Sequence, residues 1–565
     1  MNLINKNLIL TFILISIQFL DAQTSLPKDW YMLDKSKDGY YGVSAEKTIS
    51  TLLKDKPSKT VVVAILDSGV DYKHEDLKDN MWVNPKEIPN NGKDDDKNGY
   101  IDDIHGWNFI GGKNGENVSV DNYEVVRLYG KMKYKFANAD PDKISSADKK
   151  DYATFLKIKE EVESRRNAAK EALDQIEQSE SLVKNAIQSA VKALDGKPLT
   201  MENINNIDEG DSKNLSMGVA ILKQVIEENA EITSGDQLIE FIENDFAEGK
   251  KHYSKELDYA FNPDFDTRKI VGDNYKDAYE KNYGNNDVKG PDASHGTHVA
   301  GLIGAVRNNN IGMNGIATNV KIMSVRCVPD GDERDKDVAN AIRYAVDQGA
   351  TVINMSFGKG YSPEKEVVDA AVKYAASKDV LLVHAAGNSA QNNDKTDNFP
   401  CKQYKVKKFL GNNKAKNWLE IGAIAPKSNE ELVATFSNYG KKNVDVFSPG
   451  VAIYSTTPEN SYQSFQGTSM ASPIAAGVAT MLRSYFPTLT SKQIIKIIKK
   501  SVEVPNIEVI EPGTKKQVKF SSLSSSGGII NLEKAVILAT KTKGKKKVAG
   551  WNSNHTTSST DKPKA

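Results

Sequence analysis

The sequence predicts an α/β fold, in which strands of a parallel sheet alternate with buried helices and a long helical segment interrupts the pattern. Residues 61–66 and 380–383 are continuous apolar runs, which are typical of strands covered on both faces. Residues 296–305 and 470–479 are mainly small and apolar, which predicts tightly packed helices. A charged stretch rich in Glu, Lys and Ala lies between the first strand and the first of these helices, and it predicts a helical insertion.

The first predicted strand ends at an acidic residue. Asp67 directly follows the apolar run, and Ser68 and Gly69 end the strand. Ligands of open α/β sheets bind outside the carboxyl ends of the strands. We therefore expect the Asp67 carboxylate at a binding edge of the sheet.

Two histidines open the first small-residue helix. His295 and His298 are three residues apart and share one helix face, so the residues alone do not decide which ring would act as a base. A zinc protease helix has a different spacing and carries a glutamate that this segment lacks. We interpret His298 as a packed residue behind His295.

Ser469 begins the second small-residue helix. The N-terminus of a helix has free N–H groups and a partial positive charge. The backbone N–H of Ser469 is therefore suited to bind a developing oxyanion. A second donor requires a side chain, and Asn388 follows the buried strand at 380–383.

Three motifs together resemble those of the subtilisin-like serine peptidase family. The chain contains Asp67-Ser68-Gly69, His295-Gly296-Thr297-His298 and Gly467-Thr468-Ser469-Met470-Ala471, in the order Asp, His, Ser of that family. The resemblance implies a triad of Asp67, His295 and Ser469, with His295 as the base and Asn388 in the oxyanion hole. It also implies a subtilisin-like doubly wound, mainly parallel sheet formed by residues 60–113 and 282–540.

These residues favour a secreted serine endopeptidase that hydrolyses peptide bonds through an acyl-enzyme on Ser469, because a nearby base is what activates a serine hydroxyl. An alternative is a transpeptidase or limited-processing enzyme on the same fold, which would resolve the acyl-enzyme with an amine. A third interpretation is a non-enzymatic binding protein that docks a partner on the helical insertion. A lost catalytic position would favour it, but Asp67, His295, Asn388 and Ser469 are all present.

The resemblance also implies a substrate-binding edge. Protein or peptide substrates would pair as an extended strand with Ser356, Phe357 and Gly358, which follow a buried strand. Ala386 and Gly387 would form the opposite wall of the primary pocket. No acidic cluster is placed beside this pocket by the sequence, so we expect apolar or uncharged residues there.

Calcium is the expected metal, because oxygen ligands are abundant and only 2 cysteines are present. By resemblance, Asp76 and Asn309 match a calcium site of the family, although the loop that carries Asn309 is one residue longer than expected. No organic cofactor is expected.

A second calcium candidate is an acidic loop. Asp94, Asp96, Asn98 and Asp102 match positions 1, 3, 5 and 9 of an EF-hand-like loop, but position 12 is His105. A solvated acidic turn explains the same residues equally well, and the sequence leaves both interpretations open.

Composition limits the possible partners and the compartment. Lys+Arg and Asp+Glu are both 75, so no net charge indicates a nucleic acid partner. Residues 1–22 resemble a signal peptide, which predicts export to the periplasm or the medium, and no transmembrane segment follows. We expect a monomer. Cys327 and Cys401 could form one disulfide or remain two free thiols.

The remaining segments are a short N-terminal region at 23–59, the insertion at 114–281 and a tail at 541–565 that we expect to be disordered. In the insertion, apolar residues recur every seven positions and predict one helix of about 40 residues. They are Phe155, Val162, Ala169, Ile176, Val183 and Ala190. The insertion could assist folding or restrict large substrates, or it could be a tolerated surface insertion.

Overall fold

The computed structural model describes residues 26–229, 232–407 and 413–548. The chain divides into two compact units, a helical unit of residues 126–265 and a larger unit of residues 27–125 and 266–548. Within the described ranges, no helix is long and apolar enough to cross a membrane.

The larger unit is built on a parallel sheet with the strand order β2-β3-β1-β4-β5-β6-β7. The strands are β1 (Val61–Asp67), β2 (Gly106–Asn108), β3 (Val320–Arg326), β4 (Val352–Met355), β5 (Leu381–Ala385), β6 (Trp418–Ile424) and β7 (Val446–Pro449). The side chains of β4 to β7 are all buried, as the apolar runs predicted for a sheet covered on both faces. The strand β1 lies inside the sheet, so its carboxyl end has neighbouring strand ends on both sides.

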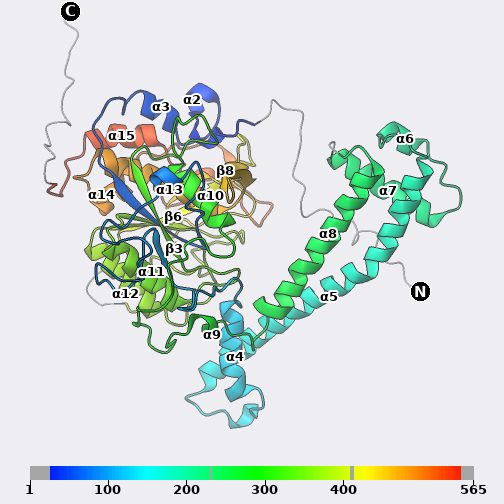
Figure 1. The fold of residues 1–565 in the computed structure, drawn as a ribbon, viewed down its shortest axis with the longest axis horizontal. Coiled ribbons are helices and arrows are strands. Elements are labelled where there is room, and N and C mark those ends of the chain that lie inside the picture. The colour runs from blue at the N-terminus through cyan, green and yellow to red at the C-terminus, as the bar shows by residue number, and fades with distance from the viewer. Residues whose placement is uncertain (1–25, 230–231, 408–412, 549–565) are drawn as a thin grey trace, which may run out of the picture. The chain divides into compact units, whose positions relative to one another are not determined.

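Helices cover both faces of this sheet, which confirms the predicted α/β class. Figure 1 shows α11 (Asp335–Asp347) and α12 (Lys365–Ser377) on one face and α13 (Thr468–Tyr485) on the other. Small residues let α13 pack closely, since a Cβ atom on Gly477 would lie 2.5 Å from the Cβ of Ile316. Around this centre lie α10 (Ser294–Gly304), α14 (Ser491–Lys500), α15 (Leu532–Thr540) and two small hairpins, β8 (Ile453–Thr457) with β9 (Ser461–Phe465) and β10 (Glu508–Ile510) with β11 (Gln517–Lys519).

The N-terminal region belongs to the same unit as the sheet. It contains η1 (Trp30–Met32), α2 (Lys35–Asp38) and α3 (Ala45–Ser50). The Trp30 side chain is fully buried, and its indole N–H donates to the carbonyls of Val451 and Ala452. Residues 541–548 of the predicted tail pack near the segment between α13 and α14, because the N–H of Lys546 donates to the carbonyl of Thr488. The rest of that tail, like the predicted signal peptide, lies outside the described residues.

The helical unit contains the long helix that the heptad pattern predicted. This helix, α5 (Lys149–Ala193), has 45 residues, and all six residues of the predicted stripe are buried. It packs against α7 (Lys213–Glu228) and α8 (Gly235–Lys255), and α4 (Glu124–Phe136), α6 (Met201–Asn205) and η4 (Glu256–Ala260) complete the unit. The remaining helical turns are the short α9 (Arg268–Val271), η2 (Lys78–Asn80), η3 (Pro141–Lys143) and η5 (Phe520–Ser522).

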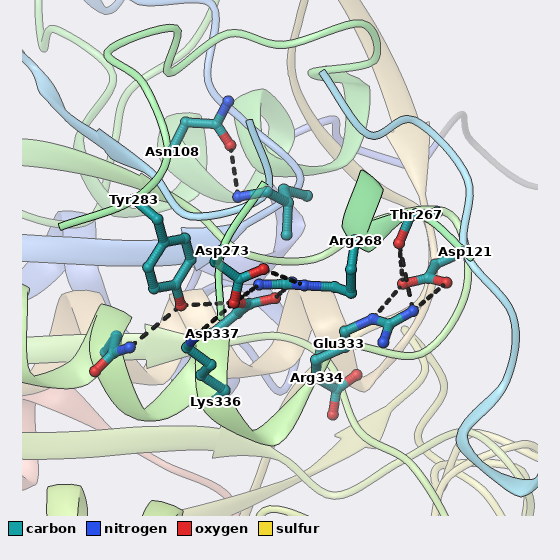
Figure 2. A network of polar contacts seen from close by, with 12 residues as sticks. Asn108, Asp121, Thr267, Arg268, Asp273, Tyr283, Glu333, Arg334, Lys336 and Asp337 are labelled. Carbon is teal, nitrogen blue, oxygen red and sulfur yellow. Dashed lines mark hydrogen bonds and ion pairs between the residues drawn. The ribbon is translucent and has the colours of Figure 1, made fainter. Parts of the chain in front are cut away.

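The chain segments that lead into and out of the helical unit meet at the start of α11. Arg334 donates to Asp121 at 2.8 Å, and the Thr267 hydroxyl donates to the same carboxylate at 3.0 Å (Figure 2). Next to them, Arg268 forms a buried ion pair with Asp337 at 2.7 Å. These contacts lie within the larger unit, so the helical unit is shorter at both ends than the insertion expected at 114–281.

Candidate active site

Asp67 lies at the carboxyl end of β1 and is 2% exposed. One carboxylate oxygen accepts a hydrogen bond from the Ser68 N–H at 2.8 Å, and the Asp67 carbonyl accepts one from Cys327 N–H at the end of β3. The other carboxylate oxygen is buried and has no hydrogen-bond partner among the described residues. The carboxylate is thus held in place, and the oxygen that accepts from Ser68 is also the one that faces a cation.

That cation can form on His295, in the first turn of α10. The Nδ1 of His295 lies 2.7 Å from the Asp67 carboxylate. Gly296 permits this approach, since a Cβ atom there would lie 2.0 Å from the carbonyl oxygen of Gly69. Burial lowers the pKa of His295, but the charge of Asp67 and its hydrogen bond outweigh burial, and the pKa is raised. With a proton on Nδ1 facing the carboxylate, Nε2 is left to act as the base.

His298 has a different environment. Its ring is fully buried, stacks on Phe465 at 4.3 Å, and directs Nε2 to the carbonyls of Ile453 and Gln463. Burial, together with the neighbouring His295, lowers the pKa of His298 to about 3. The ring is therefore neutral and holds the β8–β9 hairpin, while His295 pairs with Asp67.

Ser469 is the second residue of α13, after the N-cap Gly467. Its N–H is one of the first-turn donors that have no partner within the helix. Its hydroxyl donates to the carbonyl of Ser356 at 3.1 Å, and no hydrogen bond joins it to His295 among the described residues. A rotation about the Cα–Cβ bond of Ser469 is needed before His295 can take its proton, which is common in ligand-free sites.

The Asn388 amide is oriented by the first residue of α13. Its oxygen accepts from the Thr468 N–H at 2.9 Å and from the Thr468 hydroxyl at 2.7 Å. The Thr468 hydroxyl in turn accepts from the Gly387 N–H at 3.1 Å. The Asn388 amide nitrogen is left to donate beside the Ser469 N–H. The sequence alone does not reveal the role of Thr468, because the contact spans 80 residues.

The predicted substrate segments follow adjacent strands. Ser356, Phe357 and Gly358 come directly after β4, and Ala386 and Gly387 come directly after β5, which is its parallel neighbour. Three asparagine amides that the sequence analysis missed fix the second segment by donating to the Ala386 carbonyl. They are Asn393, Asn398 and Asn438, at 2.9, 3.0 and 2.9 Å.

The structure brings Asp76 and Asn309 together. Asp76 is fully buried, and its carboxylate accepts from the Asn309 amide at 2.7 Å and from the Met313 N–H at 3.0 Å. The Tyr462 hydroxyl lies 3.4 Å from the same carboxylate. The extra residue of this loop has not prevented the pairing.

The acidic loop is arranged differently from the predicted EF-hand pattern. Carboxylate oxygens of Asp94 and Asp96 lie within 4.8 Å of each other and of Glu87, which the sequence analysis missed. Asp102 is not part of this group, since its carboxylate accepts from the N–H groups of Asn91 and Gly92 and caps that turn.

The remaining residues of the loop also accept hydrogen bonds. Asn98 accepts through its amide oxygen from the Tyr100 N–H and donates its amide to Asp103 at 3.1 Å. Burial raises the pKa of Asp103 to about 6, although Tyr344 and the neighbouring amides donate to it.

The two cysteines are free thiols. Cys327 is buried and Cys401 is half-buried. Burial raises the pKa of both thiols, so neither is an activated nucleophile.

The sequence is similar to those of known subtilases. Residues 58–529 match the sequence profile of the Subtilase family. The thermophilic serine proteinase of Bacillus sp. (strain AK1) is 38% identical over 230 residues, which cover 40% of this chain and 50% of that protein. Subtilisin DY of Bacillus licheniformis is 36% identical over 204 residues, which cover 35% of this chain and 67% of that protein. A solved protease of Pseudoalteromonas arctica aligns with 45% of this chain and 78% of its own at 27% identity and a TM-score of 0.36.

Proposed function

The chain belongs to the subtilase family, and we propose that it is a serine endopeptidase that hydrolyses protein or peptide substrates. The observation that carries this proposal is the Asp67–His295 pair at 2.7 Å, on two elements, β1 and α10, that both pack against α13, the helix that carries Ser469. This arrangement supports nucleophilic catalysis by Ser469 with His295 as general base.

The first half of the reaction forms an acyl-enzyme. The Ser469 hydroxyl turns from Ser356 to His295, which takes its proton as the oxygen attacks the substrate carbonyl carbon. Asp67 stabilises the imidazolium that results. The oxyanion accepts hydrogen bonds from the Ser469 N–H and the Asn388 amide. As the tetrahedral intermediate collapses, the C–N bond breaks and His295 gives its proton to the leaving amine.

The second half regenerates the enzyme. Water gives a proton to His295 and attacks the acyl carbon, and the C–O bond to Ser469 then breaks. The product acid leaves, and His295 returns its proton to the Ser469 oxygen.

Labelling with a fluorophosphonate tests the proposal, because this reagent reacts with an activated serine. The purified protein should gain one adduct, measured by intact mass, and Ser469→Ala should gain none. The unsubstituted protein should also cleave casein. A folded protein that neither labels nor cleaves would overturn the proposal.

Substrates would lie in an extended conformation along residues 356–358, with 386–387 opposite. This mode uses main-chain hydrogen bonds and therefore tolerates many sequences. We expect uncharged side chains in the primary pocket, and cleavage of a peptide library, read by mass spectrometry, would show their distribution.

Calcium is proposed as a structural ion at Glu87, Asp94 and Asp96. Glu87 is 7% exposed, and one of its carboxylate oxygens is buried without a hydrogen-bond partner. Burial, with the nearby Asp96 and Asp95, raises the pKa of Glu87, although two backbone N–H groups oppose the shift. An all-oxygen, acidic donor set fits calcium. The Asp76 carboxylate shows no orphaned oxygen of this kind, and its role as a calcium ligand with Asn309 stays a prediction.

Export is proposed from the sequence of residues 1–22, with the periplasm and the medium as the two destinations. Cell fractionation followed by mass spectrometry of the new N-terminus tests this.

A further inference from the structure

The main-chain carbonyl of Ser469 lacks its helix hydrogen bond. In an α-helix this carbonyl would accept from the N–H four residues later. That residue is Pro473, inside α13, and proline has no N–H to donate. The carbonyl of the nucleophile therefore needs another partner, since it lies in a densely packed region.

Ser356 supplies that partner from a different element. Its hydroxyl donates to the Ser469 carbonyl at 2.8 Å across 113 residues of sequence. The main-chain carbonyl of Ser356 also accepts a hydrogen bond from the Ser469 hydroxyl, at 3.1 Å. Ser356 thus contacts Ser469 through both the main chain and the side chain.

A buried network holds the Ser356 hydroxyl in this direction. The Asn354 amide donates to it at 2.9 Å, and the Asn354 oxygen accepts from the Ser472 hydroxyl at 2.8 Å. Asn354 and Ser472 are fully buried and Ser356 is 4% exposed. The network joins β4 to α13 at residues 469 and 472, so it fixes both the height and the rotation of the first helical turn.

We propose that Ser356 is a positioning residue for the nucleophile. Its hydroxyl replaces the helix hydrogen bond that Pro473 cannot give. The inference deepens the proposed function and rests on it. Without this bond, the first turn of α13 is free to shift, and with it the Ser469 oxygen and the Ser469 N–H. A misplacement of about 1 Å at a reacting group costs about a hundredfold in rate.

The test is a double-mutant cycle between Ser356 and Pro473. Ser356→Ala should lower kcat on a peptide substrate about 10- to 100-fold, with KM changed less than about threefold. Pro473→Ala provides an N–H four residues after Ser469, which can satisfy the same carbonyl. In the Pro473→Ala background, Ser356→Ala should therefore cost less than about threefold in kcat.

Thr480→Ala is the matched control. It removes a fully buried hydroxyl from α13 itself, and the oxygen of this hydroxyl has no hydrogen-bond partner among the described residues. It should leave kcat within about twofold. The melting temperature of each variant is measured in parallel, so that loss of fold is separated from loss of position.

Two results would overturn the proposal. One is a kcat for Ser356→Ala within twofold of the unsubstituted protein. The other is an equal loss of kcat from Ser356→Ala in both backgrounds, which would mean that the carbonyl of Ser469 is not the group that matters. If the unsubstituted protein does not label with fluorophosphonate, the proposed function fails, and this outcome is distinct from the other two.

Discussion

At the scale of single side chains, Asp67 favours the protonated form of His295, because its charge and its hydrogen bond outweigh the burial of the ring. The pKa of His295 is raised, so the neutral ring that catalysis needs is lost as pH falls through that raised pKa. The acid limb of kcat/KM should therefore lie above the ordinary histidine value of about 6.5. In Asp67→Asn the limb should move to lower pH, and kcat should fall by about 10⁴-fold. A pH–rate profile measures both, and an unmoved acid limb would show that another group titrates.

Asn388 carries a second prediction at this scale. Asn388→Ala removes the side-chain donor of the oxyanion hole, so kcat should fall by about 10²- to 10³-fold with little change in KM. The comparison is Asn398→Ala, which removes an amide that donates to the Ala386 carbonyl rather than to the oxyanion. Equal losses in the two variants would mean that Asn388 acts only by supporting the loop.

Residues that lie beside a strong local pattern can be placed from the sequence. Asp67 ends an apolar run and Ser469 begins a small-residue helix, so their placement followed from neighbours in the chain. Thr468, Asn438 and the hydroxyl of Ser356 act through contacts that span 80, 52 and 113 residues. No local pattern encodes such contacts, and only the folded sheet edge reveals them.

At the scale of helices and loops, the sequence again reveals features with a local pattern and does not reveal contacts between distant residues. The helix α5 was predictable because a seven-residue period persists along it, and burial of one stripe is what that period requires. In the acidic loop at 94–102, the spacing of the carboxylates does not reveal that Asp102 accepts hydrogen bonds from the N–H groups of Asn91 and Gly92. Glu87 precedes that pattern in sequence and joins it only in space.

The acidic loop carries a prediction about the thermal stability of the protein. Calcium should raise the melting temperature, because it would neutralise the repulsion among Glu87, Asp94 and Asp96. Glu87→Gln should reduce this calcium-dependent rise. Asp55→Asn, which removes an exposed carboxylate elsewhere, should not. Scanning calorimetry with calcium and with a chelator measures the effect, and an equal rise in both variants would place the ion elsewhere.

At the scale of the whole molecule, the segments of the larger unit that flank the insertion contact each other without residues of the helical unit. Asp121 and Thr267 are joined by a hydrogen bond of 3.0 Å, and Arg334 binds the same carboxylate. The two segments that flank the helical unit are thus held to each other by residues of the larger unit. The N-terminal region belongs to this unit as well, through the fully buried Trp30. Neither relation could be inferred from composition, because both depend on partners that are 146 to 422 residues apart in the sequence.

Because these contacts do not involve the helical unit, we expect that the insertion can be removed. Replacing residues 126–265 with a short Gly-Ser linker should leave the larger unit folded and Ser469 labelled by fluorophosphonate at the unsubstituted rate. The ratio of casein cleavage to small-peptide cleavage should also be unchanged. Because the linker must still start and end beside Asp121 and Thr267, Arg334→Ala should destabilise both versions by about 3 kcal/mol, the cost of breaking a buried ion pair. If the shortened chain fails to fold while the full chain folds, the insertion assists folding. If casein cleavage alone rises, the insertion restricts large substrates, and in either case the tolerated-insertion interpretation is wrong.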